Sequence, residues 1–574
     1  MPTNALATSA ILLRRRYRVR SMRRALLLGL ALLAGAAPAQ AALPPHAGHP
    51  ILPAPQSVRT QQLREYRNAL VELDHVRGAG ATFVMRQAGG RLIDPQISLW
   101  QLPSAAAARM LPGLRAAGLV RSVTPDLPLR PQQVSRSLSF CTDQFCPQEW
   151  WIHAVGADVW TPPGPGAPVT MIDSGVDLSH PEFAGRPNTT PLDTQTFTAT
   201  EEELHGTATA SMVGAQANGD GHGIEGIYPQ AKLQIWDASP GGVLTVGGEI
   251  SGLSAAVERG PGVINLSLGG PDRLAIEEHA ILAAFGSGSL VVASAGNDRE
   301  DGSPRSFPAS FAHVLTIGAT DESNRATYFS SASPDMDLAA PGQDMLVAIP
   351  LFWSRPADTM PGYLPLAGTS FSAPLVSGAS AAVWTVRPTL SNTQLFEVMR
   401  RSAHRVGTRG WNRDTGYGIL DVNAALARKA PVTDPQEPNE DVYLVKPNGL
   451  FRAGHPALTA PAHPRSVLAA HLEQGDDPED VYRAYLPAKG RLTVTVRPGG
   501  PVDLEVWSRR TRSVFERGAA ARRDLLGLAI HRRASKERVV VHGGGSGQYV
   551  YVDAFLSKKA REAGYTISVS SARR

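Results

Sequence analysis

The sequence Val-Thr-Met-Ile-Asp-Ser-Gly-Val occupies residues 169–176 of this 574-residue chain. Its first four residues are mostly apolar or β-branched, and Gly175 soon interrupts them, which predicts a short buried strand of a parallel sheet. Asp173 would then stand at the carboxyl end of that strand, where open α/β sheets place their functional sites. We therefore expect an α/β fold, with a parallel sheet and helices on both faces, and a role for Asp173 in its site.

Two further motifs supply polar groups that suit the same site. His205-Gly-Thr207 begins a run of small residues, which predicts a helix packed closely against the sheet. Gly368-Thr-Ser370 separates a short strand pattern from a helical pattern that extends to Val383, with Pro374 expected in the first helical turn. Ser370 would lie near the positive end of that helix dipole. The chain thus presents a carboxylate, an imidazole and a hydroxyl, in that order.

Asp173, His205 and Ser370 carry the groups of a nucleophilic triad. A serine hydroxyl needs a nearby base, and an imidazole base needs a carboxylate that fixes its tautomer. Each motif alone is also typical of a turn or a helix cap, but the three together favour catalysis. The order Asp, His, Ser is that of subtilisins, and residues from about 150 to 426 resemble the catalytic domain of subtilisin-like serine peptidases, the subtilases. The resemblance implies that these three residues are catalytic.

A fourth segment matches the same family. Leu290-Val-Val-Ala-Ser-Ala-Gly-Asn297 is an apolar strand pattern that ends in Gly-Asn. It resembles the subtilase segment whose asparagine stabilises the oxyanion formed during the reaction. The resemblance implies that Asn297 and the backbone N–H of Ser370 form the oxyanion hole. The alternative is an asparagine that only shapes a turn.

The resemblance also implies where a substrate would bind. The segment 263–270, Val-Ile-Asn-Leu-Ser-Leu-Gly-Gly, is similar to the strand on which these peptidases pair an extended substrate. The implied substrate-binding residues are Ser267, Leu268, Gly269 and Gly270, with Ala293, Ser294, Ala295 and Gly296 as the wall of the specificity pocket. This small, apolar lining argues against an exclusive preference for a charged residue. Thr209-Ala-Ser211 departs from the usual Val-Ala-Gly of the family, which we expect to affect packing more than catalysis.

The N-terminal 41 residues are typical of a secretory signal. Arg23-Arg24 precedes an apolar run over 25–35, and Ala39-Gln-Ala41 follows; Met22 is an alternative start. The formal charge of the chain is +5, and residues 1–41 contain seven arginines and no Lys, Asp or Glu, so the remainder carries 5 − 7 = −2. No stretch reaches the length of a membrane-spanning helix. We expect a bacterial protein that is secreted and has no membrane span.

Residues 42–140 are expected to form a propeptide. Strand patterns at 79–85, 96–101 and 119–123 surround an alanine-rich helical pattern that Ser104 would cap and that ends at Ala117. This arrangement resembles the subtilase propeptide, which implies a folding template and temporary inhibitor that is cleaved within residues 130–139. Cys141 and Cys146 follow, and in an oxidising compartment their spacing favours a disulfide over a metal site.

The composition changes after residue 428. Residues 429–440 are Pro-rich and charged, which predicts a linker between a catalytic domain at 141–428 and a C-terminal domain at 441–574. A β-sandwich is predicted by short alternating runs at 491–496, 503–507, 538–541, 548–552 and 565–569.

Two acidic segments, 434–439 and 476–482, resemble parts of the bacterial pre-peptidase C-terminal domain. Their carboxylates could hold a structural calcium ion or form solvated turns, and we favour the turns, so no metal site is predicted. The Arg-rich stretch 509–538 also contains acidic residues and no recognisable nucleic-acid module, so we expect no nucleic-acid partner.

Together these features predict a monomeric, secreted serine endopeptidase that is made as a zymogen and inhibited by its own propeptide. Its substrates would be polypeptides, cleaved through an acyl-enzyme without a cofactor. The alternative is a catalytically silent binding module with the same fold. An esterase is disfavoured because the segment around Ser370 lacks the Gly-x-Ser-x-Gly spacing.

Overall fold

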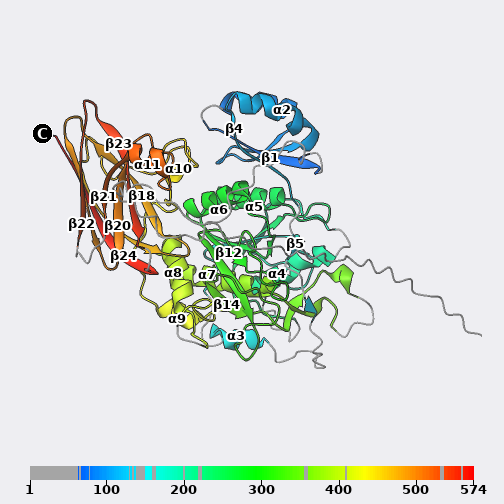
Figure 1. Ribbon diagram of the computed structural model, residues 1–574. Coiled ribbons are helices and arrows are strands. Elements are labelled where there is room, and N and C mark those ends of the chain that lie inside the picture. The colour runs from blue at the N-terminus through cyan, green and yellow to red at the C-terminus, as the bar shows by residue number, and fades with distance from the viewer. Residues whose placement is uncertain are drawn as a thin grey trace, which may run out of the picture. The chain divides into compact units, whose positions relative to one another are not determined.

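The computed structural model contains a seven-stranded parallel sheet (Figure 1). Asp173 is the last residue of one of its strands. The strand order is β14-β13-β12-β10-β7-β9-β8, and every neighbouring pair is parallel. The strands are β7 (Pro168–Asp173), β8 (Thr189–Pro191), β9 (Lys232–Asp237), β10 (Val263–Leu266), β12 (Leu290–Ser294), β13 (Val314–Thr320) and β14 (Leu338–Pro341). The strand expected to deliver Asp173 is therefore confirmed.

The structure describes residues 63, 66–75, 78–127, 130–131, 135–136, 149–157, 163–197, 201–216, 223–354, 360–407, 410–530, 536–557 and 560–573. All of them belong to one compact unit, which spans residues 46–574. The expected signal segment, Cys141 and Cys146 lie outside the described residues. Within the described ranges, no helix has both the length and the apolar composition needed to cross a membrane.

Helices cover both faces of the sheet, because successive strand residues point to opposite faces. Val169 and Met171 of β7 are buried in one core with α4 (His205–Gly214) and α7 (Thr369–Val386). Ile172 is buried in a second core with α5 (Val246–Glu258) and α6 (Ala275–Gly286). Among the described residues, this part of the chain also forms the α-helices α3 (Trp150–Ala154), α8 (Asn392–Ser402) and α9 (Val422–Ala427). The expected α/β fold is therefore confirmed.

The segment before the parallel sheet forms a four-stranded antiparallel sheet in the order β2-β3-β1-β4. Its elements are β1 (Asn68–Leu73), α1 (Thr82–Gln87), β2 (Arg91–Asp94), β3 (Leu99–Pro103), α2 (Ser104–Ala116) and β4 (Val120–Pro125). The expected helix and the expected third strand are confirmed, although Ser104 is the first helical residue and not the cap.

The strand expected at residues 79–85 is wrong. Residues Gly78–Ala81 form a 3-10 helix, and α1 follows it. Phe83 is 70% exposed, and within α1 only Met85 is buried, so the apolar residues here do not alternate between a core and solvent. The strand expected at 96–101 begins only at Leu99, because a turn precedes it.

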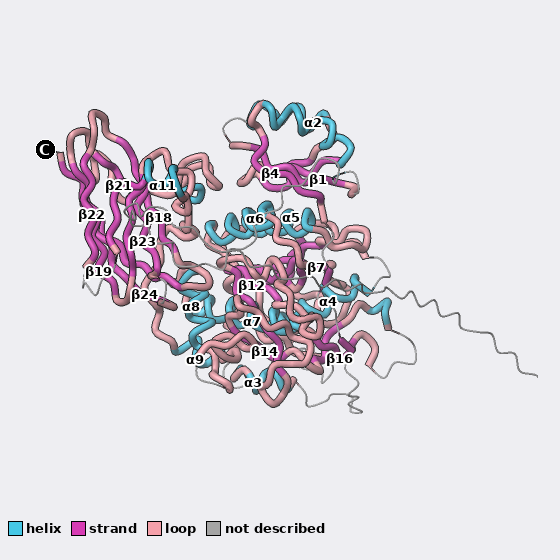
Figure 2. The backbone as a smooth tube through the Cα atoms, in the orientation of Figure 1, coloured by secondary structure: helices cyan, strands magenta, loops and turns pink. Residues whose placement is uncertain are grey.

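The last part of the chain forms two four-stranded antiparallel sheets, ordered β17-β24-β19-β22 and β18-β23-β20-β21. Figure 2 shows strands of these sheets running side by side. Both sheets contribute to one apolar core, as Val494 of β19 and Val552 of β23 illustrate. The five expected strands are confirmed as β19 (Arg491–Pro498), β20 (Val502–Trp507), β22 (Glu537–His542), β23 (Gln548–Leu556) and β24 (Glu562–Ala572).

Three strands of this part have no counterpart in the sequence prediction: β17 (Arg465–Glu473), β18 (Glu479–Leu486) and β21 (Leu525–Ala529). Two short helices, α10 (Val442–Val445) and α11 (Gly518–Asp524), accompany the sheets. The paired sheets with a common core have the architecture of a β-sandwich.

Candidate active site

Asp173 and His205 form a buried hydrogen bond at the end of β7. Asp173 is the last residue of that strand and is 1% exposed, while His205 is the first residue of α4. Nδ1 of His205 lies 2.8 Å from Oδ1 of Asp173. Because an ionised carboxylate only accepts hydrogen bonds, the proton lies on Nδ1 and the lone pair on Nε2. Nε2 has no hydrogen-bond partner among the described residues, so the geometry leaves it able to accept a proton.

Two more donors hold the Asp173 carboxylate. The backbone N–H of Ser174 donates to Oδ1 at 2.8 Å, and the hydroxyl of Thr209 donates to Oδ2 at 3.0 Å. Thr209 follows His205 by one helical turn, so both side chains lie on the same face of α4. The carboxylate is therefore fixed on both of its oxygens.

Gly206 explains why a glycine must follow the histidine. A Cβ at this position would lie 2.1 Å from the carbonyl oxygen of Gly175, so no larger residue fits unless the backbone moves. The N–H of Gly206 also donates to Oγ of Ser174 at 2.9 Å. Gly175 itself has a φ of +82°, a conformation that favours glycine. The close contact between the strand end and α4 brings Asp173 and His205 within hydrogen-bond distance.

Ser370 lies at the start of α7, close to the histidine. β16 (Tyr363–Ala367) ends just before this helix, and Ser370 is fully buried. Oγ of Ser370 is 3.5 Å from the carbonyl oxygen of Ser267. The ring of Phe371, the next residue, has its centroid 6.3 Å from that of the His205 ring. The fold thus brings the three motifs of the sequence together.

Pro374 lies beyond the first turn of α7, which corrects the expected position. It is the sixth residue of the helix, and it has no N–H to donate to the carbonyl of Ser370 four residues earlier. The hydroxyl of Ser267 donates to that carbonyl instead, at 2.9 Å. The proline therefore allows a direct link between Ser370 and the segment 267–270.

Asn297 packs against the loop that carries Ser370. Its Oδ1 accepts from both the N–H and the hydroxyl of Thr369, each at 2.9 Å. Because Oδ1 binds Thr369, the amide nitrogen Nδ2 points away from Thr369. A Cβ placed on Gly368 would lie 3.2 Å from Nδ2. The structure therefore places the Asn297 amide next to the backbone of residues 368–370.

The predicted substrate-binding residues follow two adjacent strands. β10 and β12 pair in parallel with Leu266 opposite Ala293, so segments 267–270 and 293–296 lie at neighbouring strand ends. β11 (Leu268–Gly269) pairs antiparallel with β5 (Arg130–Pro131).

A second short pairing lies on the other side of the nucleophile loop. β16 pairs antiparallel with β6 (Ser135–Arg136) and, on its other side, with β15 (Met345–Ala348). A segment from before the parallel sheet thus contacts both backbone edges that adjoin Ser370.

Comparison with known proteins agrees with this geometry. The sequence pattern of the Subtilase family, peptidase S8, matches residues 164–418. Subtilisin DY of Bacillus licheniformis is 31% identical over 267 residues, which cover 46% of this chain and 91% of that protein. The chain belongs to the subtilase family. Subtilisin amylosacchariticus of Bacillus subtilis subsp. amylosacchariticus is 31% identical over 269 residues, which cover 46% of this chain and only 66% of that relative's length.

A solved structure extends the likeness in fold beyond the subtilase pattern. Fervidolysin from Fervidobacterium pennivorans, described as a keratinolytic enzyme related to subtilisin, superposes with a TM-score of 0.54. The superposition covers 84% of this chain and 92% of fervidolysin, at 18% sequence identity. At this identity the comparison concerns the fold.

The hydrogen bond of Thr209 to Asp173 was not predicted from the sequence. Thr209 occupies a position where valine is usual in the subtilase motif, and packing was the expected consequence. Its spacing of four residues from His205 was the available signal, because residues four apart on a helix share a face. The structure shows a hydrogen bond to Asp173 instead of a purely apolar contact.

Proposed function

We propose that this subtilase is a serine endopeptidase that hydrolyses peptide bonds with Asp173, His205 and Ser370. The observation that carries the proposal is the 2.8 Å hydrogen bond between Asp173 and His205, close to the start of α7. Oγ of Ser370 would attack the substrate carbonyl carbon while its proton passes to Nε2 of His205. The imidazolium, stabilised by Asp173, would then protonate the departing amine. Water would hydrolyse the resulting acyl-enzyme.

Asn297 and the backbone N–H of Ser370 would stabilise the oxyanion of each tetrahedral intermediate. The first N–H groups of a helix lack intrahelical acceptors, and Ser370 is the second residue of α7. The two hydrogen bonds from Thr369 to Oδ1 of Asn297 support this role. They fix the side-chain amide so that its N–H groups, on Nδ2, point away from Thr369. Donors preorganised in this manner contribute most of the rate enhancement in many enzymes.

Polypeptides are the proposed substrates. An extended chain would pair with Leu268 and Gly269 and present a side chain to the wall formed by residues 293–296. The antiparallel pairing of β5 with β11 supports this mode, because it shows that the edge accepts an extended backbone. The alternative, a catalytically silent binding module, is disfavoured because all four polar residues of the reaction are present.

We further propose that the protein is secreted as a zymogen whose propeptide is residues 42–140. The signal-like composition of residues 1–41 supports export. Contacts between the N-terminal sheet and α5 and α6 support inhibition: Oδ1 of Asp126 accepts from the N–H of Gly247 at 2.7 Å, and Glu72 lies 2.8 Å from His279. Cleavage would fall between the paired dipeptides 130–131 and 135–136.

The test uses Ser370→Ala, which removes the nucleophile and little volume. The purified wild-type chain should cleave casein, and a serine-directed covalent reagent should block this activity. The Ser370→Ala variant should neither cleave casein nor react with the reagent. In a protease-deficient host the variant should also keep the 42–140 segment attached. Ser372→Ala is the matched control, because the Ser372 hydroxyl bonds the carbonyls of Ala340 and Pro341, on the neighbouring strand end.

Two outcomes would contradict the proposal. Retained proteolysis in purified Ser370→Ala would exclude Ser370 as the nucleophile. A folded wild-type chain that neither cleaves casein nor reacts with the reagent would support the silent binding module.

A further inference from the structure

Buried carboxylates gather at the start of β18, outside the candidate active site. Asp434 belongs to the segment after α9, Asp477 to the turn before β18, and Asp480 to β18 itself. A carboxylate oxygen of each lies within 4.8 Å of the other two. Glu437 interacts electrostatically with all three. We refer to these four residues as the acidic cluster.

Protein donors hold one oxygen on three of these side chains. The N–H of His471 donates to Oδ2 of Asp434 at 2.7 Å, and the hydroxyl of Tyr565 donates to Oδ2 of Asp480 at 2.6 Å. The amide of Asn439 donates to Oε1 of Glu437 at 2.7 Å. These bonds fix the orientation of each carboxylate and occupy only one of its two oxygens.

The second oxygens have no donor in the described part of the chain. Oδ1 of Asp434, Oδ1 of Asp477, Oδ1 of Asp480 and Oε2 of Glu437 are all buried without a hydrogen-bond partner. Asp480 is 0% exposed. A buried carboxylate without a partner costs several kcal/mol, and neighbouring carboxylates repel each other as well. The cluster is therefore stabilised either by protons or by a bound cation.

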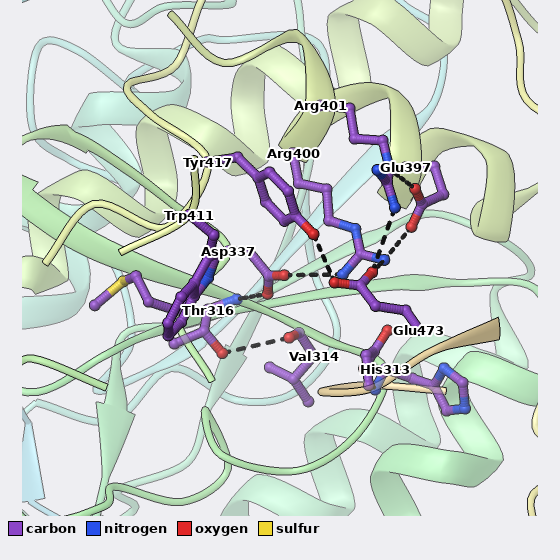
Figure 3. A network of polar contacts seen from close by, with 12 residues as sticks. His313, Val314, Thr316, Asp337, Glu397, Arg400, Arg401, Trp411, Tyr417 and Glu473 are labelled. Atoms are coloured by element: carbon purple, nitrogen blue, oxygen red, sulfur yellow. Dashed lines mark hydrogen bonds and ion pairs between the residues drawn. The ribbon is translucent and has the colours of Figure 1, made fainter. Parts of the chain in front are cut away.

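Two cationic side chains of this region are engaged with other carboxylates. Nε2 of His313 contacts Glu440, and it lies 3.6 Å from Oε2 of Glu437. Arg400 contacts three other carboxylates, those of Asp337, Glu397 and Glu473 (Figure 3). Neither side chain balances the charge of the three aspartates.

We propose that Asp434, Asp477 and Asp480, with Glu437 beside them, bind one Ca²⁺ ion. The set offers only oxygen donors, which suit a hard cation and not zinc or copper. Calcium accepts irregular sets of six to eight oxygens, whereas magnesium demands a regular octahedron. A cavity of about 590 Å³ borders Asp434, Glu437 and Asp477 and has room for water ligands.

The ion would join the segment 434–437 to the turn before β18, and that turn contacts the catalytic part of the chain. Oδ1 of Asp476 accepts from the N–H of His313 at 2.6 Å. Glu473, at the end of β17, binds Arg400 and accepts from the hydroxyl of Tyr417 at 2.6 Å (Figure 3). Calcium would therefore stabilise the attachment of the C-terminal sheets.

The experiment compares the full chain carrying Ser370→Ala, which limits self-digestion, with versions that also carry Asp477→Asn or Asp480→Asn. After chelator treatment, Ca²⁺ binding is measured by calorimetry and thermal unfolding is followed with and without Ca²⁺. We expect Ca²⁺ to raise the unfolding temperature of the parent chain. Each variant should lose one bound equivalent, or bind it at least about tenfold more weakly.

Terbium gives a local readout of the same site. Tb³⁺ replaces Ca²⁺ in oxygen sites, and the Tyr565 hydroxyl bonds Asp480, so excitation of tyrosine should sensitise its luminescence. The signal should fall in Asp480→Asn and be displaced by Ca²⁺. The matched control is Asp524→Asn, because Asp524 is buried in the same part of the chain but has partners in Ser508 and Arg523. That variant should keep both the bound equivalent and the luminescence.

Three results would overturn the proposal. One is a parent chain whose unfolding temperature does not respond to Ca²⁺. Another is an unchanged number of bound ions in both cluster variants. Without Ca²⁺, Asp477→Asn should be at least as stable as the parent, because a neutral amide relieves repulsion. An equal loss of stability with and without Ca²⁺ would mean that the aspartates act only structurally.

Discussion

The hydrogen bonds of Asp173 illustrate control of the site at the scale of single residues. Its Oδ1 accepts from His205 and from Ser174, and its Oδ2 accepts from Thr209. The donors come from the strand end and from α4, so the carboxylate has one orientation. A fixed carboxylate holds the imidazole in one tautomer, with Nε2 as the basic nitrogen.

We predict that Thr209→Val lowers kcat/KM about tenfold, because Oδ2 of Asp173 loses a donor worth about 1–2 kcal/mol in a buried site. The change should appear mainly in kcat, since Thr209 positions Asp173 and does not line the proposed substrate edge. Thr209→Ser keeps the hydroxyl and should retain most of the activity. Steady-state kinetics on a short chromogenic peptide measure kcat and KM of the two variants. Equal rates for Thr209→Val and the wild type would show that the hydrogen bond to Asp173 is unimportant for catalysis.

We predict that Asn297→Ala lowers kcat by roughly 10² to 10³ with little change in KM, as is known for the corresponding change in subtilisin. The reason is that the amide would serve the transition state more than the bound substrate. Asn392→Ala is the control, because the amide of Asn392 bonds the carbonyls of Phe285 and Ser289. A rise in KM with unchanged kcat would instead assign Asn297 to substrate binding.

At the scale of elements, the sequence pattern predicted the helices and strands whose residues are nearly all buried. The buried strand β7 and the small-residue helices α4 and α7 each have a continuous apolar or small-residue sequence, and all three are confirmed. The pattern predicted a strand where α1 forms, because apolar residues of this segment face solvent. It also missed β17, whose burial is mixed, because its faces depend on partners distant in sequence.

The positions of the proposed site residues within the fold were predictable for a related reason. All four lie at or near the ends of elements that the sequence predicts. Asp173 ends β7 and His205 begins α4. Ser370 is the second residue of α7, and Asn297 follows the end of β12 by three residues. The role of Thr209 and the position of Pro374 required knowledge of how α4 and α7 pack. The acidic cluster was expected to form solvated turns, because a sequence does not show that strands will bury the carboxylates.

A pair of buried glutamates between α5 and α6 makes stability depend on pH. Burial raises the pKa of Glu249 to about 8, and burial together with Glu249 raises the pKa of Glu277 well above its usual value. The folded state therefore holds protons that the unfolded chain releases near pH 4.5. The protonated glutamates therefore contribute fully to the free energy of unfolding below about pH 4.5, and this contribution is lost as the pH rises through about 8.

We predict that Glu277→Gln reduces this decline, because an amide stays neutral at every pH and can donate to Glu249. Thermal unfolding of the Ser370→Ala chain across that pH range provides the measurement. Glu258→Gln is the control, since Glu258 is an exposed residue at the end of α5. Identical pH profiles for Glu277→Gln and its parent would contradict the prediction.

At the scale of the whole molecule, the C-terminal sheets contact the catalytic part through residues outside the proposed triad, as the ion pair of Glu473 with Arg400 illustrates. We predict that a chain ending at about residue 430 hydrolyses short peptides at nearly the full rate, because the proposed catalytic residues lie between Asp173 and Ser370. Its unfolding temperature should fall, since Arg400, with 4% of its side chain exposed, loses Glu473. Turnover of a fibrous protein should fall too, because an appended domain raises the local substrate concentration.

Comparison of both forms on a chromogenic peptide and on a fibrous protein measures these effects. Glu473→Gln in the full chain separates the loss of one ion-pair partner from the loss of the domain. A collapse of peptide hydrolysis in a truncated chain that still unfolds cooperatively would show that the C-terminal sheets help to build the active site.

The short pairings of β5 with β11 and of β6 with β16 have a kinetic consequence. The two dipeptides belong to the same chain as the edges that they contact, so the first cleavage would be unimolecular. The half-time of maturation should then stay constant when the precursor is diluted. Cleavage of one molecule by another would lengthen that half-time in proportion to dilution, so a dilution series of freshly refolded precursor distinguishes the two routes.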